Sequence, residues 1–384
     1  MRFELPEELE MLRLVVREFA ETEVAPGASG RDEEERFDRS LFTKMAELGL
    51  TGIPVPERYG GSAAGWLAYV IVLEELARVC VSTSAVLAAH TAYTVWPLYR
   101  YGSDSIRDRL LQPYASGAQL GGAGLYETSN SAASSAVELV EEQRLNVVEE
   151  EAGGLVLQGT HPFVLNAGEA DGYFILAPSR QTRRLHALWL SADAPGLTAG
   201  NRHSKLGLRA FATGELLFQA CRIESGDTVG REGRAREMLQ PIKMIAALGA
   251  AAQSVGAAQG AMAAATRYAK ERKQFGAPIG RQQSILFKLA DMSVAAEASR
   301  LLVYQAAWRL DQGYSAVREA SLARTYAAEA AVRTALEAVQ IMGGYGYMRE
   351  FKLERLLRDV KCLETALALG GLEGISPMRS KSKS

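Results

Sequence analysis

The side chains that most often carry out nucleophilic, redox or metal chemistry are few in this sequence and lie far apart. The 384 residues hold these cysteines and histidines: Cys80, Cys221, Cys362, His90, His161, His186 and His203. The cysteines are odd in number and have neither the pattern of a disulfide framework nor the paired spacing of a zinc site. No two histidines stand at metal-ligand spacing. We therefore expect three reduced thiols, histidines that are structural or exposed, and no metal site.

Composition excludes several classes of partner. The 43 basic and 45 acidic side chains leave a formal net charge of −2, which gives no overall attraction to nucleic acid or to an anionic membrane. No apolar stretch reaches the roughly 18 residues of a membrane span. The first residues, Met1 to Glu4, are unlike a secretory signal. We expect a cytoplasmic protein of two or three domains, with no nucleic-acid partner and no membrane span.

The first part of the chain, residues 1–117, has the periodicity of helices. Apolar residues recur every three or four positions from Leu9 to Phe19, on one face between charged positions. Further helical stretches are predicted at 39–47 and 65–78, separated by segments rich in glycine and proline. This pattern predicts an N-terminal domain made only of helices.

The periodicity changes twice after this point. Residues 118–230 contain short runs of β-branched and aromatic residues bounded by turn formers, which predicts a small antiparallel β-domain. Residues 231–384 are helical again, with long helices expected at 237–272, 282–311 and 316–342. Helices of this length need partners along their whole length, so we expect a helical bundle and an oligomer, followed by a short disordered tail.

Five short phrases occur in order over about 300 residues. They are Pro54–Gly61 (PVPERYGG), Leu73–Arg78 (LEELAR), Lys205–Arg209 (KLGLR), Glu271–Gly276 (ERKQFG) and Gln340–Tyr347 (QIMGGYGY). With the order helical, β, helical, these phrases make the chain resemble the acyl-CoA dehydrogenase family over nearly its whole length. The resemblance implies an α+β fold with an N-terminal all-α domain, a middle antiparallel β-domain and a C-terminal four-helix-bundle domain.

The resemblance also implies a chemistry. Family members hold FAD and oxidise an acyl-CoA thioester between its α and β carbons. A glutamate removes the α proton, the flavin accepts a hydride from the β carbon, and an electron-transferring flavoprotein takes the electrons. The base must be a positioned carboxylate, and hydrogen-bond donors must polarise the thioester carbonyl. The implied partners are therefore an acyl-CoA thioester, an electron-transferring flavoprotein, and further subunits in a homotetramer or in a hetero-oligomer with a paralogous dehydrogenase.

The residues that a family member supplies to its neighbour's FAD are present in this chain. The matching set comprises Arg272 and Phe275 on the diphosphate and adenine side, Gln340, Gly343 and Gly344 on the adenosine half, and Gln283 as a further polar contact. An arginine fork suits diphosphate oxygens, and glycines let backbone amides approach a ligand closely. If the resemblance is set aside, the alternative interpretation is structural: Arg272 is a cation at a helix end, and Gly343-Gly344 is a helix cap.

The residues that a subunit uses for its own flavin ring have changed. Where the family carries Thr-Glu-Pro-Gly-Ala-Gly-Ser-Asp, this chain has Tyr126–Ala133, which keeps only the glutamate. In the next loop the usual Lys-Thr-Trp-Ile-Thr-Asn becomes His161–Asn166. Phe163 can still stack on a ring, whereas Leu165 cannot form a side-chain hydrogen bond with it.

The expected catalytic base is also absent. Counting from Arg358 to Lys361 places Leu367 at the usual glutamate position, and counting back from Tyr268 places Ala246 at the alternative one. Glu364 and Glu373 lie nearby in the sequence, but Glu364 is three residues before Leu367 on a predicted helix, which turns it in another direction. We therefore assign no catalytic residue to the chain.

Three functions are compatible with these residues. The first is a non-catalytic or impaired subunit that completes the FAD site of a paralogous, active acyl-CoA dehydrogenase subunit. The second is a homotetrameric FAD-dependent acyl-CoA dehydrogenase with an altered pocket and an unrecognised base. The third is a flavin-free acyl-CoA-binding or scaffold protein that retains only the fold. Because the losses concern the chain's own flavin and the retained residues its neighbour's, we favour the first.

Overall fold

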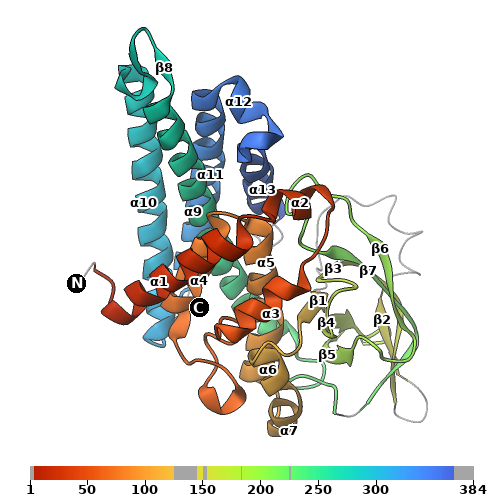
Figure 1. Cartoon of the computed structure of the whole chain (residues 1–384). Coiled ribbons are helices and arrows are strands. Elements are labelled where there is room, and N and C mark those ends of the chain that lie inside the picture. Colours follow the sequence, from red (N-terminus) through yellow and green to blue (C-terminus); the bar gives the residue numbers. More distant parts are fainter. Residues whose placement is uncertain (1–3, 125–144, 150–153, 183, 225, 367–384) are drawn as a thin grey trace, which may run out of the picture.

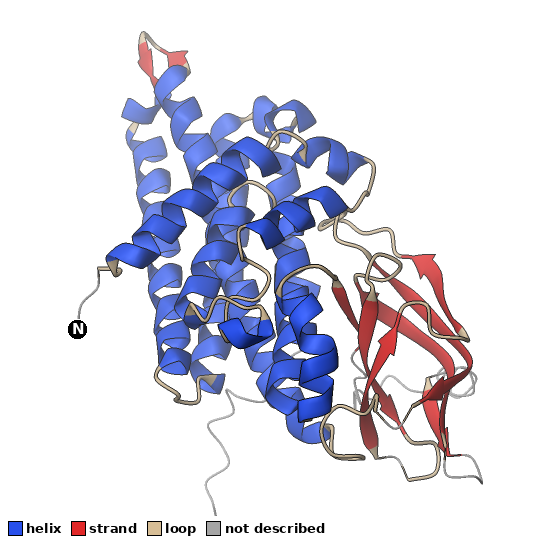
Figure 2. Ribbon diagram, turned by 60° about the horizontal axis from the view of Figure 1, so that its bottom comes forward, coloured by secondary structure: helices blue, strands red, loops and turns tan. Residues whose placement is uncertain are grey.

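The computed structural model describes residues 4–124, 145–149, 154–182, 184–224 and 226–366. Helices from the two ends of the sequence pack together, and a single large sheet lies beside them (Figures 1 and 2). This is the expected arrangement of an N-terminal helical part, a middle sheet and a C-terminal helical part. No helix among the described residues is long and apolar enough to cross a membrane.

Eight α-helices within residues 4–124 form the N-terminal part. They are α1 (Glu7–Phe19), α2 (Ala28–Glu33), α3 (Arg39–Glu47), α4 (Gly65–Ala77), α5 (Val81–His90), α6 (Trp96–Tyr101), α7 (Asp104–Ile106) and α8 (Gln112–Ala115). The helices predicted at 39–47 and 65–78 are α3 and α4. The Asp38 carboxylate caps α3 by accepting a hydrogen bond from the Ser40 backbone N–H at 3.1 Å. Helix α4 is buried on nearly all sides and forms the centre of the helical core.

The middle part is a sheet of seven strands. The strands are β1 (Gly121–Gly124), β2 (Asn146–Glu149), β3 (Leu155–Leu165), β4 (Gly172–Pro178), β5 (Leu185–Ser191), β6 (Leu197–Arg202) and β7 (Thr213–Ile223). Their order is β5-β4-β1-β3-β7-β6, and β2 pairs with β3. The sheet is antiparallel except for the pair β1–β4, which is parallel. The sequence did not indicate this pair, because β1 reads Gly-Gly-Ala-Gly and lacks β-branched residues.

The C-terminal part is a bundle of long helices. They are α9 (Arg236–Glu271), α10 (Gln283–Asp311), α11 (Val317–Met342) and α13 (Leu353–Ala366), with the short α12 (Gly344–Tyr347) before the last. Between α9 and α10 a hairpin of β8 (Lys273–Gln274) and β9 (Ala277–Pro278) projects beyond the helix ends (Figure 1). Helix α9 also packs tightly on α4, since a Cβ on Gly256 would collide with the Glu74 carbonyl oxygen. Small residues therefore let the two helices approach closely.

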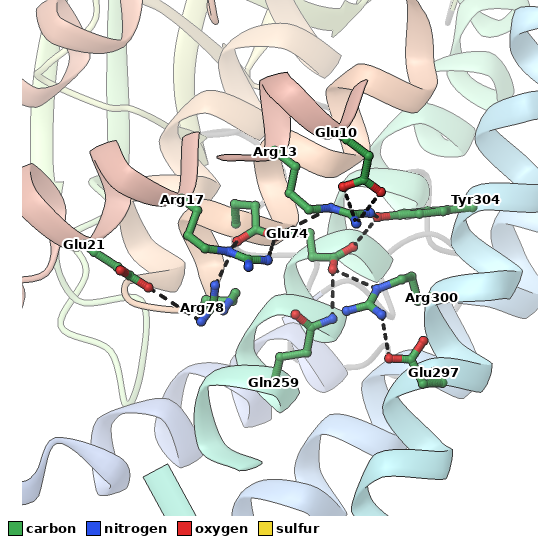
Figure 3. Close-up of polar contacts among 11 residues, drawn as sticks. Glu10, Arg13, Arg17, Glu21, Glu74, Arg78, Gln259, Glu297, Arg300 and Tyr304 are labelled. Carbon is green, nitrogen blue, oxygen red and sulfur yellow. Dashed lines mark hydrogen bonds and ion pairs between the residues drawn. The ribbon is translucent and has the colours of Figure 1, made fainter. Parts of the chain in front are cut away.

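Two adjacent buried carboxylates on α4 tie the helices together (Figure 3). Glu75, which is 1% exposed, accepts two hydrogen bonds from Arg17 of α1, at 2.8 and 3.0 Å. Arg78 donates to the same carboxylate at 3.0 Å. Burial raises the pKa of Glu75, but the hydrogen bonds and charges of Arg17 and Arg78 outweigh it, and the pKa lies below its usual value.

Glu74 projects in a different direction from Glu75 and joins α4 to the bundle. Its carboxylate accepts hydrogen bonds from Gln259 of α9 at 2.8 Å and from Arg300 and Tyr304 of α10, both at 3.0 Å (Figure 3). The Tyr304 hydroxyl in turn accepts a hydrogen bond from Arg13 of α1 at 2.9 Å. One polar network therefore connects α1, α4, α9 and α10.

We expect Glu75→Gln to lower the free energy of unfolding by about 2–4 kcal/mol at pH 7, because it leaves partly buried arginines facing a neutral group. The folded-state pKa of Glu75 is lowered, so its contribution is present above the unfolded pKa and is lost as the pH falls below it. Urea unfolding of both proteins from pH 3.5 to 8 measures this. The matched control is the exposed Glu18→Gln on α1, for which we expect a change within about 0.5 kcal/mol. Equal stability of wild type and Glu75→Gln at pH 7 would contradict the role of the network.

Candidate functional site

A cavity of about 440 Å³ opens at the end of the bundle where the β8–β9 hairpin projects. It lies between the end of α9, the start of α10 and the segment that follows α11. Its lining consists of Tyr268, Arg272, Gln274, Ile279, Gln282, Ile285, Ile341, Met342, Gly343, Gly344, Tyr345 and Met348. The fold thus brings Arg272 close to Gly343 and Gly344, which lie far from it in the sequence.

The backbone explains how these three residues come to face the same space. Arg272 follows the last residue of α9 in an extended conformation (φ −70°, ψ 124°), and its carbonyl accepts from the Ile279 N–H at 2.8 Å. Gly343 ends α11 with a positive φ of 59°, which favours glycine. A Cβ on Gly343 or Gly344 would meet no protein atom within 4 Å. The backbone of both glycines therefore borders open space that a ligand can fill.

The other predicted residues of this set lie around the cavity without lining it. Phe275 is 99% exposed at the turn of the β8–β9 hairpin, with a positive φ of 51°. Gln283 and Gln340 are exposed, at the start of α10 and at the end of α11. The glutamine that lines the cavity is Gln282, the residue before the predicted Gln283. The side chains of Phe275, Gln283 and Gln340 are therefore accessible at the surface of the single chain.

The aromatic wall of the cavity was missed by the sequence analysis. Tyr268 and Tyr345 both line it, with ring centroids 6.1 Å apart. The Tyr345 ring also lies 4.9 Å from that of Phe351. Tyr345 stands inside the QIMGGYGY phrase, so its position was visible, but nothing in the local spacing indicated that it faces Tyr268 of α9.

The residues expected at the chain's own flavin ring lie elsewhere, in the sheet. Phe163 on β3 is 40% exposed and stacks on His203, with ring centroids 5.4 Å apart and 28° between the planes. Leu165 ends the same strand and pairs with Ala123 of β1 and Thr213 of β7. The segment Tyr126–Ala133 lies outside the described residues. Phe163 and the cavity therefore belong to separate parts of one chain.

Neither expected base position supplies a carboxylate among the described residues. Ala246 is half-buried on α9, and Leu367 lies outside the described part of the chain. Glu364, on α13, forms an ion pair with Lys361 one turn before it. Glu364 is therefore paired with a cation on its own helix, and no catalytic base is assigned to it.

His90 anchors the strand that leads toward Tyr126. The Gly121 backbone N–H donates to His90 Nδ1 at 3.0 Å, so this nitrogen carries no proton. Nε2 lies 2.9 Å from the Tyr114 carbonyl oxygen and donates to it. Burial lowers the pKa of His90 from 6.5 to about 4, so the ring is neutral at physiological pH. Asn166 holds the same strand through its side-chain amide, which donates to the Gly121 carbonyl at 2.9 Å.

Comparison with known proteins agrees with this architecture. Residues 6–118 match the acyl-CoA dehydrogenase N-terminal domain, and residues 244–370 match the acyl-CoA dehydrogenase C-terminal domain. An acyl-CoA dehydrogenase of Bacillus subtilis is 37% identical over 91% of this chain and 92% of its own length. The chain belongs to the acyl-CoA dehydrogenase family. The family and fold expectations are thereby confirmed, and with them the link to flavoprotein oxidoreductases of fatty acid metabolism.

Two solved structures have the same fold as this chain. Butyryl-CoA dehydrogenase from Megasphaera elsdenii superimposes with a TM-score of 0.89 at 32% identity, and 96% of each chain is covered. PigA, in a structure with FAD and proline, superimposes with a TM-score of 0.87 at 26% identity, covering 96% of this chain and 95% of its own. The fold of this chain is therefore shared with both proteins.

We expect His90 to remain a neutral imidazole protonated on Nε2 from pH 5 to 8, and to titrate at about pH 4. Its folded-state pKa lies below 6.5, so the unfolded chain binds the proton first and stability falls as the pH drops from 6.5 toward 4. Nitrogen-15 NMR of the histidine rings measures the tautomer and the titration, and His90→Ala assigns the signal. A ring that becomes charged near pH 6.5 in the folded protein would contradict this structural role.

Proposed function

We propose that this chain is a non-catalytic subunit that completes the FAD site of a paralogous, active subunit in a hetero-oligomeric acyl-CoA dehydrogenase. The observation that carries the proposal is a contrast between two parts of the chain. Arg272, Gly343 and Gly344 line an open cavity at the end of the bundle. At the position of the alternative base, by contrast, α9 presents only the methyl group of Ala246.

The cavity suits the diphosphate and adenosine part of FAD. Arg272 offers a planar fork of donors that matches phosphate oxygens, and the open space in front of Gly343 and Gly344 lets backbone groups approach a ligand. Phe275, exposed on the hairpin, would contact the neighbouring subunit beside the cofactor. Bound FAD would supply hydride acceptance from the β carbon of an acyl-CoA thioester, and an electron-transferring flavoprotein would receive the electrons.

The outer face of α10 supports assembly with other subunits. Phe287, Val294, Leu301 and Trp308 are each more than half exposed and follow one another at intervals of seven residues. Seven-residue spacing places these apolar side chains on one stripe of the helix, as in a helix that packs along a partner helix. The stripe and the hairpin both expose apolar side chains that another subunit could cover, and both lie on the C-terminal bundle.

The missing carboxylate is the reason to assign catalysis to the other subunit. A positioned general base is worth about 10²- to 10⁴-fold in rate, so its loss removes most of the proton abstraction. The chain would then bind and orient FAD without moving a proton on the thioester. Its contribution to the reaction would be measured as cofactor occupancy of the active subunit.

A homotetrameric, FAD-dependent acyl-CoA dehydrogenase with an unrecognised base is the alternative. It is favoured by the similarity over nearly the full length to the Bacillus subtilis acyl-CoA dehydrogenase and to butyryl-CoA dehydrogenase. In that case the base would be a residue other than those at the two family positions. Flavin content distinguishes the two proposals, because only the alternative requires FAD on the chain alone.

We expect the chain to purify without stoichiometric FAD when expressed alone, and to form a yellow complex when co-expressed with an active paralogue. Flavin absorbance per chain and the mass of the complex measure this. The alternative predicts a yellow homo-oligomer with one FAD per chain whose flavin is bleached by an acyl-CoA. That outcome would reject the non-catalytic assignment.

We expect Arg272→Ala to weaken FAD binding by the co-expressed complex about 10- to 100-fold, because hydrogen bonds to charged groups contribute about 1.5–3 kcal/mol. Arg272→Lys keeps the positive charge but not the planar fork of donors. Its affinity for FAD should lie between that of the wild type and that of Arg272→Ala. Arg267→Ala is the matched control, since Arg267 is an exposed arginine of α9 outside the lining of the cavity. FAD dissociation constants are measured by flavin fluorescence. Equal affinities for Arg272→Ala and Arg267→Ala would exclude Arg272 from the cofactor site.

A further inference from the structure

The end of the bundle that carries the cavity is strongly cationic. We call it the hairpin end and define it as residues 270–281, which include the β8–β9 hairpin, and residues 343–352, which follow α11 (Figure 1). Its exposed cations are Lys270, Arg272, Lys273, Arg281, Arg349 and Lys352. Only Glu271 and Glu350 carry the opposite charge, so six cations and two carboxylates leave a formal net charge of +4 here, against −2 for the whole chain. The positive charge is therefore concentrated at one place on the molecule.

The chain itself does not neutralise these six cations. None of their side chains forms an ion pair or a hydrogen bond within the residues that the structure describes. Other arginines are paired: Arg17 and Arg78 bind Glu75, and Arg358 binds Asp32. Cations of like sign repel one another, so an anionic partner is the kind that this surface attracts. The charge of the hairpin end is therefore available to a partner.

Aromatic and other apolar side chains lie among the cations. Phe275 is 99% exposed, Tyr347 80% and Met348 55%. Tyr345 and Met348 also line the cavity. Protein interfaces are enriched in aromatic residues, methionine and arginine, and their rim is polar. The hairpin end thus has the composition of a surface that another protein covers.

The diphosphate of FAD does not account for all of this charge. Among the six cations only Arg272 lines the cavity, and the other five stand outside the lining. A diphosphate carries about one negative charge on each phosphate, so about two positive charges remain at the hairpin end after FAD is bound. The surface that presents the FAD must therefore supply further negative charge if the hairpin end is to be neutralised.

We propose that the hairpin end docks on an acidic surface of the paralogous subunit, where carboxylates surround the FAD diphosphate, and that this charge pairing speeds the association of the two subunits. The inference rests on the proposed function and adds the chemistry of the partner. Charges at the rim of an interface act mainly on the association rate and its salt dependence. Like charge also opposes pairing of the hairpin ends of two copies of this chain, which favours a different chain as the partner.

The association rate of this chain with the active paralogue that co-purifies with it tests the proposal. We expect the wild-type rate to fall about 10- to 100-fold between about 50 and about 500 mM salt, because salt screens the attraction. The test variant removes four cations outside the cavity lining: Lys273→Gln, Arg281→Gln, Arg349→Gln and Lys352→Gln. At low salt it should associate about as slowly as the wild type at high salt, with a dissociation rate within about threefold of wild type.

A matched control removes the same charge elsewhere. It carries Arg180→Gln, Arg222→Gln, Arg231→Gln and Arg236→Gln, four exposed arginines of the sheet and the start of α9 whose side chains form no ion pair within the described residues. The start of α9 lies 36 residues from the hairpin. The control should associate at the wild-type rate, and equal slowing in both variants would overturn the proposal, because net charge alone would then explain the effect.

The other outcomes separate this proposal from the subunit role. A complex that holds FAD but whose association rate is independent of salt would overturn the acidic partner and leave the subunit role in place. Absence of any complex would reject the subunit role and this proposal with it. Salt-dependent self-association that the test variant loses would assign the surface to a second copy. Binding to vesicles of phosphatidylcholine and phosphatidylserine that the test variant loses would assign it to an anionic lipid surface, and either result would overturn the proposal.

Discussion

Two adjacent carboxylates buried on one helix are the constraint on which the arrangement of the helices depends. Removing Glu74 and Glu75 from water costs several kcal/mol each unless both are paired, and as consecutive residues of α4 they project in different directions. Glu75 needs the arginines of α1, and Glu74 needs Gln259 of α9 with Arg300 and Tyr304 of α10. These partners can be reached only when α1, α9 and α10 surround α4. Satisfying the pair therefore fixes the relative positions of helices from both ends of the chain.

The placement of the cavity follows from this packing. Helix α9 is aligned on α4 by Gln259 and by the close approach at Gly256, and it continues three turns further to Arg272. Helix α10 is held by Arg300 and Tyr304, and its start lies beside the end of α9. The cavity forms where the two helices extend beyond the network and α11 ends at Gly343. Residues outside the lining of the cavity thus determine whether Arg272 and Gly343 face each other.

The sequence was sufficient for the parts of the fold with strong periodicity or distinctive phrases. The bounds of α3, the three long helices and the family were predictable, because apolar spacing and short motifs are local signals. The parallel pairing of β1 with β4 was not, because a glycine-rich strand has no pattern of its own. At the site, Arg272 and the two glycines could be named from the phrases. Tyr268 and Gln282 could not, because their place in the lining depends on how α9, α10 and α11 pack. The phrase LEELAR likewise gave no sign that its two glutamates are buried.

The heptad stripe of α10 and the hairpin tip at Phe275 have a consequence for the chain in dilute solution. Apolar side chains that remain in water stabilise nothing, and they contribute only after they meet another surface. If they pack in an assembly, part of the free energy that keeps this chain folded depends on how many partner molecules are present. Chains that have not met a partner would then be the fraction most exposed to aggregation and proteolysis.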